Sequence, residues 1–206
     1  SKGVMLPYRA MWSNADFAEH VLGKAIVPGD NIISILPMAH MYGMAFEFLF
    51  EFIKGCHVFY LTRIPSPAII AAAFADVKPR IIISVPLIIE KIIKKKVFPK
   101  LQDPRIRLLL KMPGLNKRIY ERINEQVTKA FGGNFYEIII GGAAFSQEVE
   151  QFLHRIGFRY TVGYGATECA PIIGYEDWSR FAPGSCGKAA YHMQVEIDSP
   201  DPANIP

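Results

Sequence analysis

Short apolar segments alternate with longer amphipathic segments along most of the chain, and this alternation predicts strands and helices in turn. Stretches such as NIISIL and RIIISV are rich in β-branched residues and stop at a proline, which is typical of buried strands. The predicted strands are residues 31–36, 57–61, 80–85, 136–140 and 158–162, with a last one at 194–198. The predicted helices are residues 11–22, 42–54, 66–75, 87–97, 115–131 and 146–156, and a short helix within 99–113 is left open.

Signals for helix ends support several of these boundaries. Gly55 stands where a left-handed C-cap is expected, and Ser66 stands where an N-cap is expected. Ser146, with Glu148 and Glu150 in the following turn, predicts a capping box. Because the strands are separated by helices, the predicted fold class is α/β, with layered, mostly parallel sheets flanked by helices. In such sheets, ligands bind beyond the carboxyl ends of the strands.

The loop after the strand at 158–162, with the sequence GYGATE, carries the most chemistry. Its glycines let the backbone approach a ligand closely, and Tyr164 offers a flat face for stacking. Thr167 places a hydroxyl beside the carboxylate of Glu168. This pair suits a phosphate with its Mg²⁺, because Mg²⁺ takes hard oxygen ligands. A glycine-rich turn around a packed tyrosine is the alternative.

Two further strand exits carry candidate ligand contacts. Gly141, Gly142 and Ala143 follow the strand at 136–140, and paired glycines again permit close approach, although a tight turn between strand and helix has the same pattern. His40 follows the strand at 31–36, where it could contact a substrate or act as a gate. The alternative is a structural role, which is the more common one for a lone histidine among apolar residues.

The composition is that of a folded domain without a strong bias in charge. The chain has 206 residues, of which 50% are hydrophobic and 20% charged, and its formal net charge is +4. At about 150 residues per domain, this length gives between one and two domains. A charge this small and diffuse argues against a nucleic-acid partner. No apolar run reaches the roughly 18–20 residues of a membrane span; the nearest, residues 41–53, contains Glu47 and Glu51.

The cysteines and the lysine run bear on location. Three cysteines are too few and too scattered for a disulfide framework or a zinc site, which indicates reduced thiols in a cytoplasmic protein. Lys94, Lys95 and Lys96 are explained by a solvated helix face; attraction to anionic lipid or nucleotide is the alternative and keeps peripheral membrane contact open. The chain opens as a loop exit and closes in an irregular polar tail, so we expect a piece of a larger enzyme.

Taken in order, several segments resemble the motifs of the AMP-binding (acyl-adenylate-forming) superfamily, and most closely its long-chain fatty-acid–CoA ligases. They are SKGVML at 1–6, LPMAHMY at 36–42, the stretch from KPR to VPLIIEK at 78–91, GGA at 141–143, GYGATE at 163–168 and PGSCGK at 183–188. GYGATE followed by PGSCGK is the most specific part, and Cys186 stands where the family usually has valine. The resemblance covers most of the chain.

The resemblance implies roles for the matched residues. It places the adenine of ATP against Tyr164, the α-phosphate near Thr167 and Mg²⁺ on Glu168. It also places His40 near the substrate carboxylate and the acyl entrance, and Lys2 at the end of the loop that holds the β- and γ-phosphates. The catalytic set it implies is Thr167, Glu168 and His40, and the nucleotide-binding set is Lys2, Gly141, Gly142, Ala143, Gly163, Tyr164, Gly165 and Thr167, with Glu168 as the metal ligand.

The implied activity is that of an ATP-dependent long-chain fatty acid–CoA ligase, which uses ATP, Mg²⁺ and CoA and has fatty acid, ATP and CoA as its small-molecule partners. The alternatives are an acyl–carrier-protein synthetase, another acyl-adenylating enzyme, or a non-catalytic nucleotide- or lipid-binding module. Residues 1–206 are then a fragment of the N-terminal domain, with a core at about 31–175. The C-terminal domain of the same chain is the missing partner, so we expect the fragment alone to have little or no ligase activity.

Overall fold

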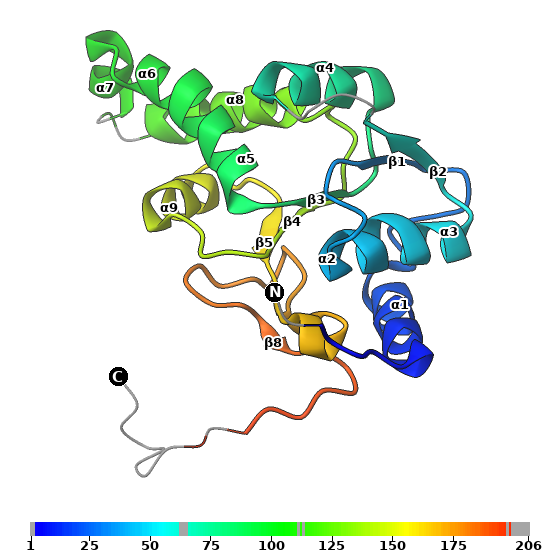
Figure 1. Ribbon diagram of the computed structural model, residues 1–206. Coiled ribbons are helices and arrows are strands. Elements are labelled where there is room, and N and C mark those ends of the chain that lie inside the picture. Colours follow the sequence, from blue (N-terminus) through cyan, green and yellow to red (C-terminus); the bar gives the residue numbers. More distant parts are fainter. Residues whose placement is uncertain (1–2, 62–65, 111, 113, 197, 199–206) are drawn as a thin grey trace.

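The fold is built around short parallel strands (Figure 1). The computed structural model describes residues 3–61, 66–110, 112, 114–196 and 198. One parallel sheet has the order β3 (Ile82–Ser84), β4 (Ile138–Ile140) and β5 (Tyr160–Val162). A second parallel pair consists of β1 (Asn31–Ser34) and β2 (His57–Tyr60), and β1 contacts β3. These strands confirm the predicted α/β class.

Helices precede, connect and follow the parallel strands. They are α1 (Tyr8–Leu22), α2 (Met41–Gly43), η1 (Met44–Leu49), α3 (Phe50–Lys54), α4 (Pro67–Val77), α5 (Pro86–Ile92), η2 (Ile93–Val97), α6 (Phe98–Leu101), α7 (Pro104–Leu110), α8 (Leu115–Ala130), α9 (Gln147–Arg155) and the 3₁₀ turn η3 (Thr167–Cys169). The π-helical stretch η1 joins α2 to α3, so the three form one continuous helical segment. The region left open at 99–113 contains most of α6 and all of α7.

Helices bury the central sheet on both faces. Because side chains alternate along each strand, neighbouring residues pack on opposite faces. Ile82 and Ile138 pack into one apolar cluster, to which helices α4, α5, α8 and α9 contribute. Ile83 and Ile139 pack into the other cluster, to which α1 and the α2–α3 segment contribute. All four isoleucines are buried, and this packing fixes the sheet at the centre of the molecule.

A small antiparallel sheet follows β5 and was not predicted. Its strands are β6 (Tyr164–Gly165), β7 (Ile172–Tyr175) and β8 (Lys188–Ala189). Two of these strands have only two residues, which is too short for a hydrophobic pattern to register. The strand predicted at 194–198 is wrong over its described residues, which form no strand, and Val195 is 61% exposed.

The predicted helix ends are confirmed at two positions and wrong at a third. Gly55 has φ +76° and ends α3 in the left-handed conformation, and the Ser66 hydroxyl accepts a hydrogen bond from the Ile69 N–H at 3.3 Å. Ser146 makes no side-chain cap at the start of α9. Its own N–H donates to Glu90 Oε1 at 2.9 Å, so a carboxylate from α5 fixes this turn in place of a capping box.

Two glutamates of the α2–α3 segment are fully buried, Glu47 and Glu51. Glu47 accepts hydrogen bonds from the Ser34 hydroxyl and from two backbone N–H groups, whereas neither oxygen of Glu51 has a hydrogen-bond partner among the described residues. Burial raises the pKa of Glu47 to about 7 and that of Glu51 to about 8. Among the described residues, no helix has the length and apolar character to cross a membrane.

We predict that the stability of the protein falls as pH rises, and that Glu51→Gln weakens this dependence. The pKa of Glu51 is raised to about 8 in the folded protein, so folding favours the protonated form. Its contribution to stability is complete below the unfolded pKa and is lost as pH rises through the folded pKa. Urea unfolding at several pH values between these two pKa values measures how steeply the free energy of unfolding falls as pH rises. This slope should be smaller in Glu51→Gln than in wild type by about 1.4 kcal/mol per pH unit.

The exposed carboxylate of Glu121 provides the matched control for this measurement. Glu121→Gln removes a carboxyl group of the same kind from the surface of α8 and is expected to leave the slope unchanged. Equal slopes for wild type and Glu51→Gln would show that Glu51 is solvated or paired in solution.

Candidate active site

Two glycine turns lie side by side at the carboxyl ends of β4 and β5. The Gly141 N–H donates to Ser84 O at 3.0 Å, and the Gly163 N–H donates to Ile140 O at 2.9 Å, so both turns continue the ladder of the parallel sheet. A Cβ added to Gly141 would lie 3.4 Å from Gly163 O. Two of the three strand exits singled out in the sequence are therefore neighbours.

The glycines are required by close backbone contacts. A Cβ on Gly165 would lie 2.4 Å from Pro171 O, which belongs to the strand-like segment opposite. Gly142 has φ +85°, in the left-handed region that disfavours side chains. Replacement at either position forces the turn away from the sheet edge.

The loop after β5 turns back on itself through the antiparallel sheet. β6 pairs with β7, and the Ala166 N–H donates to Pro171 O at 2.9 Å. The 3₁₀ turn η3 follows, which leaves Tyr164 55% exposed and both Thr167 and Glu168 exposed. The aromatic face, the hydroxyl and the carboxylate thus come from one short, tightly bonded loop.

An apolar cleft opens between this loop and the helices on one side of the sheet. α1 contributes Phe17 and Leu22, the α2–α3 segment contributes Tyr42 and Phe46, and the strand ends contribute Ile139. The mouth is more polar, since it is lined by the glycine turns together with the following side chains: His40, Tyr164 and Thr167. The cleft can therefore enclose an apolar group and present polar atoms to the end of that group.

A second pocket, the side pocket, lies next to the cleft. It is lined by residues 142–145, by the loop 163–165 and by residues 184–186 of the PGSCGK segment. The Gly184 N–H donates to Glu150 Oε1 at 3.0 Å, which ties that segment to α9. Tyr164 lines both the cleft and the side pocket, as do Gly142, Gly163 and Gly165, so the two pockets adjoin at this loop.

His40 is held at the mouth of the cleft by local structure. It is the N-cap of α2, and its Nδ1 accepts a hydrogen bond from the Tyr42 N–H at 3.2 Å. In the neutral imidazole this leaves the proton on Nε2, which is the nitrogen available to a ligand. Glu47 fixes the strand exit that leads to His40, since its carboxylate accepts from the N–H groups of Ile35 and Leu36 at 3.2 and 2.9 Å.

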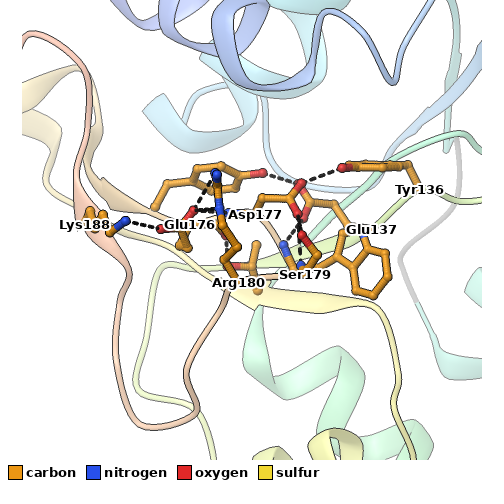
Figure 2. Close-up of polar contacts among 10 residues, drawn as sticks. Tyr136, Glu137, Glu176, Asp177, Ser179, Arg180 and Lys188 are labelled. Atoms are coloured by element: carbon orange, nitrogen blue, oxygen red, sulfur yellow. Dashed lines mark hydrogen bonds and ion pairs between the residues drawn. The ribbon is translucent and has the colours of Figure 1, made fainter.

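A polar cluster fastens the antiparallel sheet to the parallel sheet (Figure 2). Glu137, just before β4, accepts hydrogen bonds from the Tyr175 hydroxyl and from the Trp178 N–H. Glu176 is paired with Arg180 at 2.9 Å and with Lys188 at 3.2 Å. These contacts fix β7 and β8, and through the β6–β7 pairing they fix the loop that carries Tyr164.

The predicted site residues mostly converge. The cleft brings together His40, Gly141, Gly142, Gly163, Tyr164, Gly165 and Thr167. Ala143 lines the side pocket only, and Glu168 follows Thr167 in the sequence without lining either pocket. Lys2 lies outside the described residues. The described residues that line the cleft include no lysine or arginine.

Glu168 has the properties of a ligand for a metal bound mainly by phosphate. It is exposed, and among the described residues it makes no ion pair or side-chain hydrogen bond within the usual distances. The described part of the chain holds no group of three His, Cys, Asp or Glu side chains that could bind a metal ion. A single carboxylate beside a hydroxyl fits Mg²⁺, which keeps phosphate and water oxygens as its other ligands.

The sequence reasoning missed three residues that shape this site: Tyr42, Glu47 and Glu137. The Tyr42 hydroxyl donates to Ile139 O at 3.0 Å, and its ring lies against Gly141. A signal existed for Glu47, because a carboxyl inside an apolar helix needs a buried partner. No comparable signal existed for Glu137, whose partners Tyr175 and Trp178 lie far along the chain.

Comparison with known proteins adds an independent finding. The family model described as "AMP-binding enzyme" matches residues 1–204. The chain is 25% identical to long-chain-fatty-acid–CoA ligase 4 of Saccharomyces cerevisiae, over 81% of the chain and 26% of that protein. It is 26% identical to luciferin 4-monooxygenase of Photinus pyralis, over 95% of the chain and 30% of that protein. The chain thus spans less than a third of the length of these relatives.

Solved structures share the fold. ATP-bound MatB from Rhodopseudomonas palustris matches with a TM-score of 0.65 at 20% identity, over 93% of this chain and 31% of that one. At this identity the match supports the fold alone. It agrees with the α/β arrangement of strands and helices described above.

Proposed function

Because this chain belongs to the AMP-binding enzyme family, we propose that it forms part of an ATP-dependent ligase that activates a long-chain fatty acid as its adenylate and transfers the acyl group to the thiol of CoA. The observation that carries the proposal is the position of Tyr164. Tyr164 lines both the apolar cleft and the glycine-lined side pocket, and it is 55% exposed, with Thr167 and Glu168 exposed in the next turn.

In this proposal the side pocket takes the nucleotide. Adenine stacks on the exposed ring of Tyr164, and Gly142 and Ala143, which line the side pocket, allow the base to approach the backbone closely. Gly141, the first residue of this turn, lines the neighbouring cleft. The Thr167 hydroxyl donates to the α-phosphate, and Glu168 holds Mg²⁺ against the phosphates. Gly163 and Gly165, on either side of Tyr164, line both pockets, and as glycines they leave room for a ligand beside Tyr164.

The cleft takes the acid. Its walls of Phe17, Leu22, Phe46 and Ile139 suit an alkyl chain, because apolar surface is stabilised by removal from water. The carboxylate end then faces the mouth, where the Nε2 of His40 is available as a donor.

The chemistry is a displacement at phosphorus followed by a displacement at carbon. A carboxylate oxygen attacks the α-phosphorus of ATP, and the bond to pyrophosphate breaks. Bound Mg²⁺ supplies charge neutralisation for this meeting of two anions. The chain's part is to position the reactants: Tyr164 and the glycine turns hold the nucleotide, and Thr167 orients the phosphate. The thiol of CoA then attacks the acyl carbon, and AMP leaves.

We further propose that residues 1–206 are one part of a larger adenylate-forming unit, with its core at about 31–175. Within the part of the chain that the structure describes, the cleft lining includes no lysine or arginine to bind the β- and γ-phosphates. Lys2, which resembles the end of a phosphate-binding loop, is a candidate for this role, and a C-terminal domain of the same protein would supply the remaining groups.

The complete gene product should catalyse ATP–pyrophosphate exchange that depends on palmitate, and should release AMP when CoA is added. Tyr164→Ala is expected to raise the KM for ATP about tenfold or more, because base–aromatic stacking is worth about 1–3 kcal/mol. Tyr8→Ala removes a tyrosine that is 90% exposed on α1 and outside both pockets, and it should behave as wild type.

The outcomes separate the alternatives. Exchange with palmitate but no product with CoA would point to another thiol acceptor, such as a carrier protein. Exchange with benzoate alone would exclude a long-chain substrate. ATP binding without exchange for any acid would indicate a non-catalytic nucleotide-binding module and would refute the ligase.

A further inference from the structure

The segment 91–130 is far more basic than the rest of the chain. It contains twelve lysines and arginines but only three carboxylates, Asp103, Glu121 and Glu125, which gives it a formal charge of +9. The whole chain carries +4, so the remaining residues sum to −5. The small net charge of the chain therefore hides a strong separation of charge between one segment and the rest.

These cations are presented to solvent. The segment covers η2, α6, α7 and α8, which contact one another and form the corner at the upper left of Figure 1. The structure describes the side chains of ten of these twelve lysines and arginines, and all ten are exposed. They are Lys91, Lys94, Lys95, Lys96, Lys100, Arg105, Lys117, Arg118, Arg122 and Lys129. Of these ten side chains, only that of Lys94 lies within 4 Å of a carboxylate among the described residues, at 3.9 Å from Glu90. We call this segment the basic corner.

The basic corner also exposes large apolar side chains where α7 turns into α8. Leu108 is 65% exposed, Met112 47% and Leu115 41%. Leu109 is 36% exposed and lines an apolar groove between the helices. Exposed apolar residues clustered at one turn are costly in water and mark an interaction surface.

Cations and apolar groups share the same groove. It is lined by Leu101, Ile106 and Leu109, whereas Lys96, Lys100 and Arg122 bring exposed cationic side chains to it. A partner that fits this surface must offer negative charge and an apolar layer at close range. An anionic lipid bilayer offers both, because phosphate headgroups lie directly over acyl chains.

We propose that the basic corner docks the protein on the surface of an anionic membrane. Lysines and arginines of η2, α6 and α8 contact lipid phosphates, and Leu108, Met112 and Leu115 enter the boundary between headgroups and acyl chains. A nucleic acid fits less well, since it would satisfy the charge and leave the three apolar side chains in water. The contact lies at the surface, because no helix of the described residues is long and apolar enough to span a bilayer.

This proposal is independent of the ligase reaction. No described residue of the basic corner lines the cleft or the side pocket. A membrane contact can therefore be measured without any turnover, and its failure would leave the proposed chemistry untouched.

Vesicle flotation of the complete gene product tests the proposal. Vesicles of phosphatidylcholine with and without phosphatidylglycerol are compared, at low and high salt. We expect binding only with phosphatidylglycerol, loss of binding at high salt, and at least about tenfold weaker binding for Lys100→Glu/Arg122→Glu, since each basic side chain near an anionic surface contributes measurably. Leu108→Ser/Met112→Ser keeps every cation and should still weaken binding to the phosphatidylglycerol vesicles at low salt, where the wild type binds.

A matched double variant, Arg9→Glu/Lys24→Glu, reverses two exposed cations outside the basic corner that have no carboxylate within 4 Å among the described residues. It should bind within about twofold of wild type. Equal binding to both kinds of vesicle, or equal losses in the two charge-reversed variants, would overturn the proposal. Binding of a DNA duplex without vesicle binding would replace the membrane with a nucleic acid.

Discussion

Glu168→Ala should reduce ATP–pyrophosphate exchange in the complete gene product by about 100-fold or more, while the protein remains folded. The expected loss follows from the proposed role of the carboxylate as a ligand for Mg²⁺, whose charge stabilisation in the transition state is worth several kcal/mol. The side chain is exposed and makes no hydrogen bond or ion pair among the described residues. Its removal should therefore change the melting temperature by no more than about 2 °C.

Two further variants make this expectation specific. Glu168→Gln keeps the size of the side chain and removes its charge, so it should lose as much activity as Glu168→Ala, and both should need more Mg²⁺ for half-maximal rate. Glu121→Ala removes an exposed carboxylate from α8 and should retain full exchange. Unchanged exchange and unchanged Mg²⁺ dependence in Glu168→Ala would remove this carboxylate from the mechanism.

Regular structure was predictable where local pattern and packing agree. The helices and parallel strands have long or strongly apolar segments, and β3 and β4 are buried on both faces, as runs of isoleucine indicate. The glycine turns were also predictable as strand exits, because glycine after an apolar strand favours a turn or a close approach of the backbone. Their adjacency followed from the parallel sheet, in which the carboxyl ends of neighbouring strands meet at one edge.

The antiparallel sheet was not predictable, because its information is not local. β6 and β8 have two residues each, and both are specified by pairing with β7. Gly174 of β7 allows this pairing, because a Cβ at that position would lie only 2.9 Å from the backbone oxygen of Cys186. The role of Glu137 was not predictable either, because its hydrogen-bond donors lie about 40 positions away in the sequence. Contacts of this kind are decided by how the chain folds back, which no short window of sequence contains.

Glu137 is the residue whose loss should most disturb the candidate site without touching a ligand. Its side chain is fully buried, and burial raises its pKa to about 8. It accepts hydrogen bonds from the Tyr175 hydroxyl and, at 3.1 Å, from the Trp178 N–H. Tyr175 in turn lines the cleft and packs edge-on against Phe17 of α1, with ring centroids 5.7 Å apart.

Glu137→Ala should lower the free energy of unfolding by about 3–5 kcal/mol, because it leaves the buried Tyr175 hydroxyl and the half-buried Trp178 N–H without an acceptor and creates a cavity. Glu137→Gln keeps the volume and one acceptor, so its loss should be smaller. The decisive measurement is a double-mutant cycle of Glu137→Ala and Tyr175→Phe, in which urea unfolding gives the free energy of unfolding of each protein. A coupling energy above about 1 kcal/mol is expected, since each single change disrupts the same hydrogen bond. Additive losses would mean that Tyr175 and Glu137 act separately, and that the cleft wall is held by packing alone.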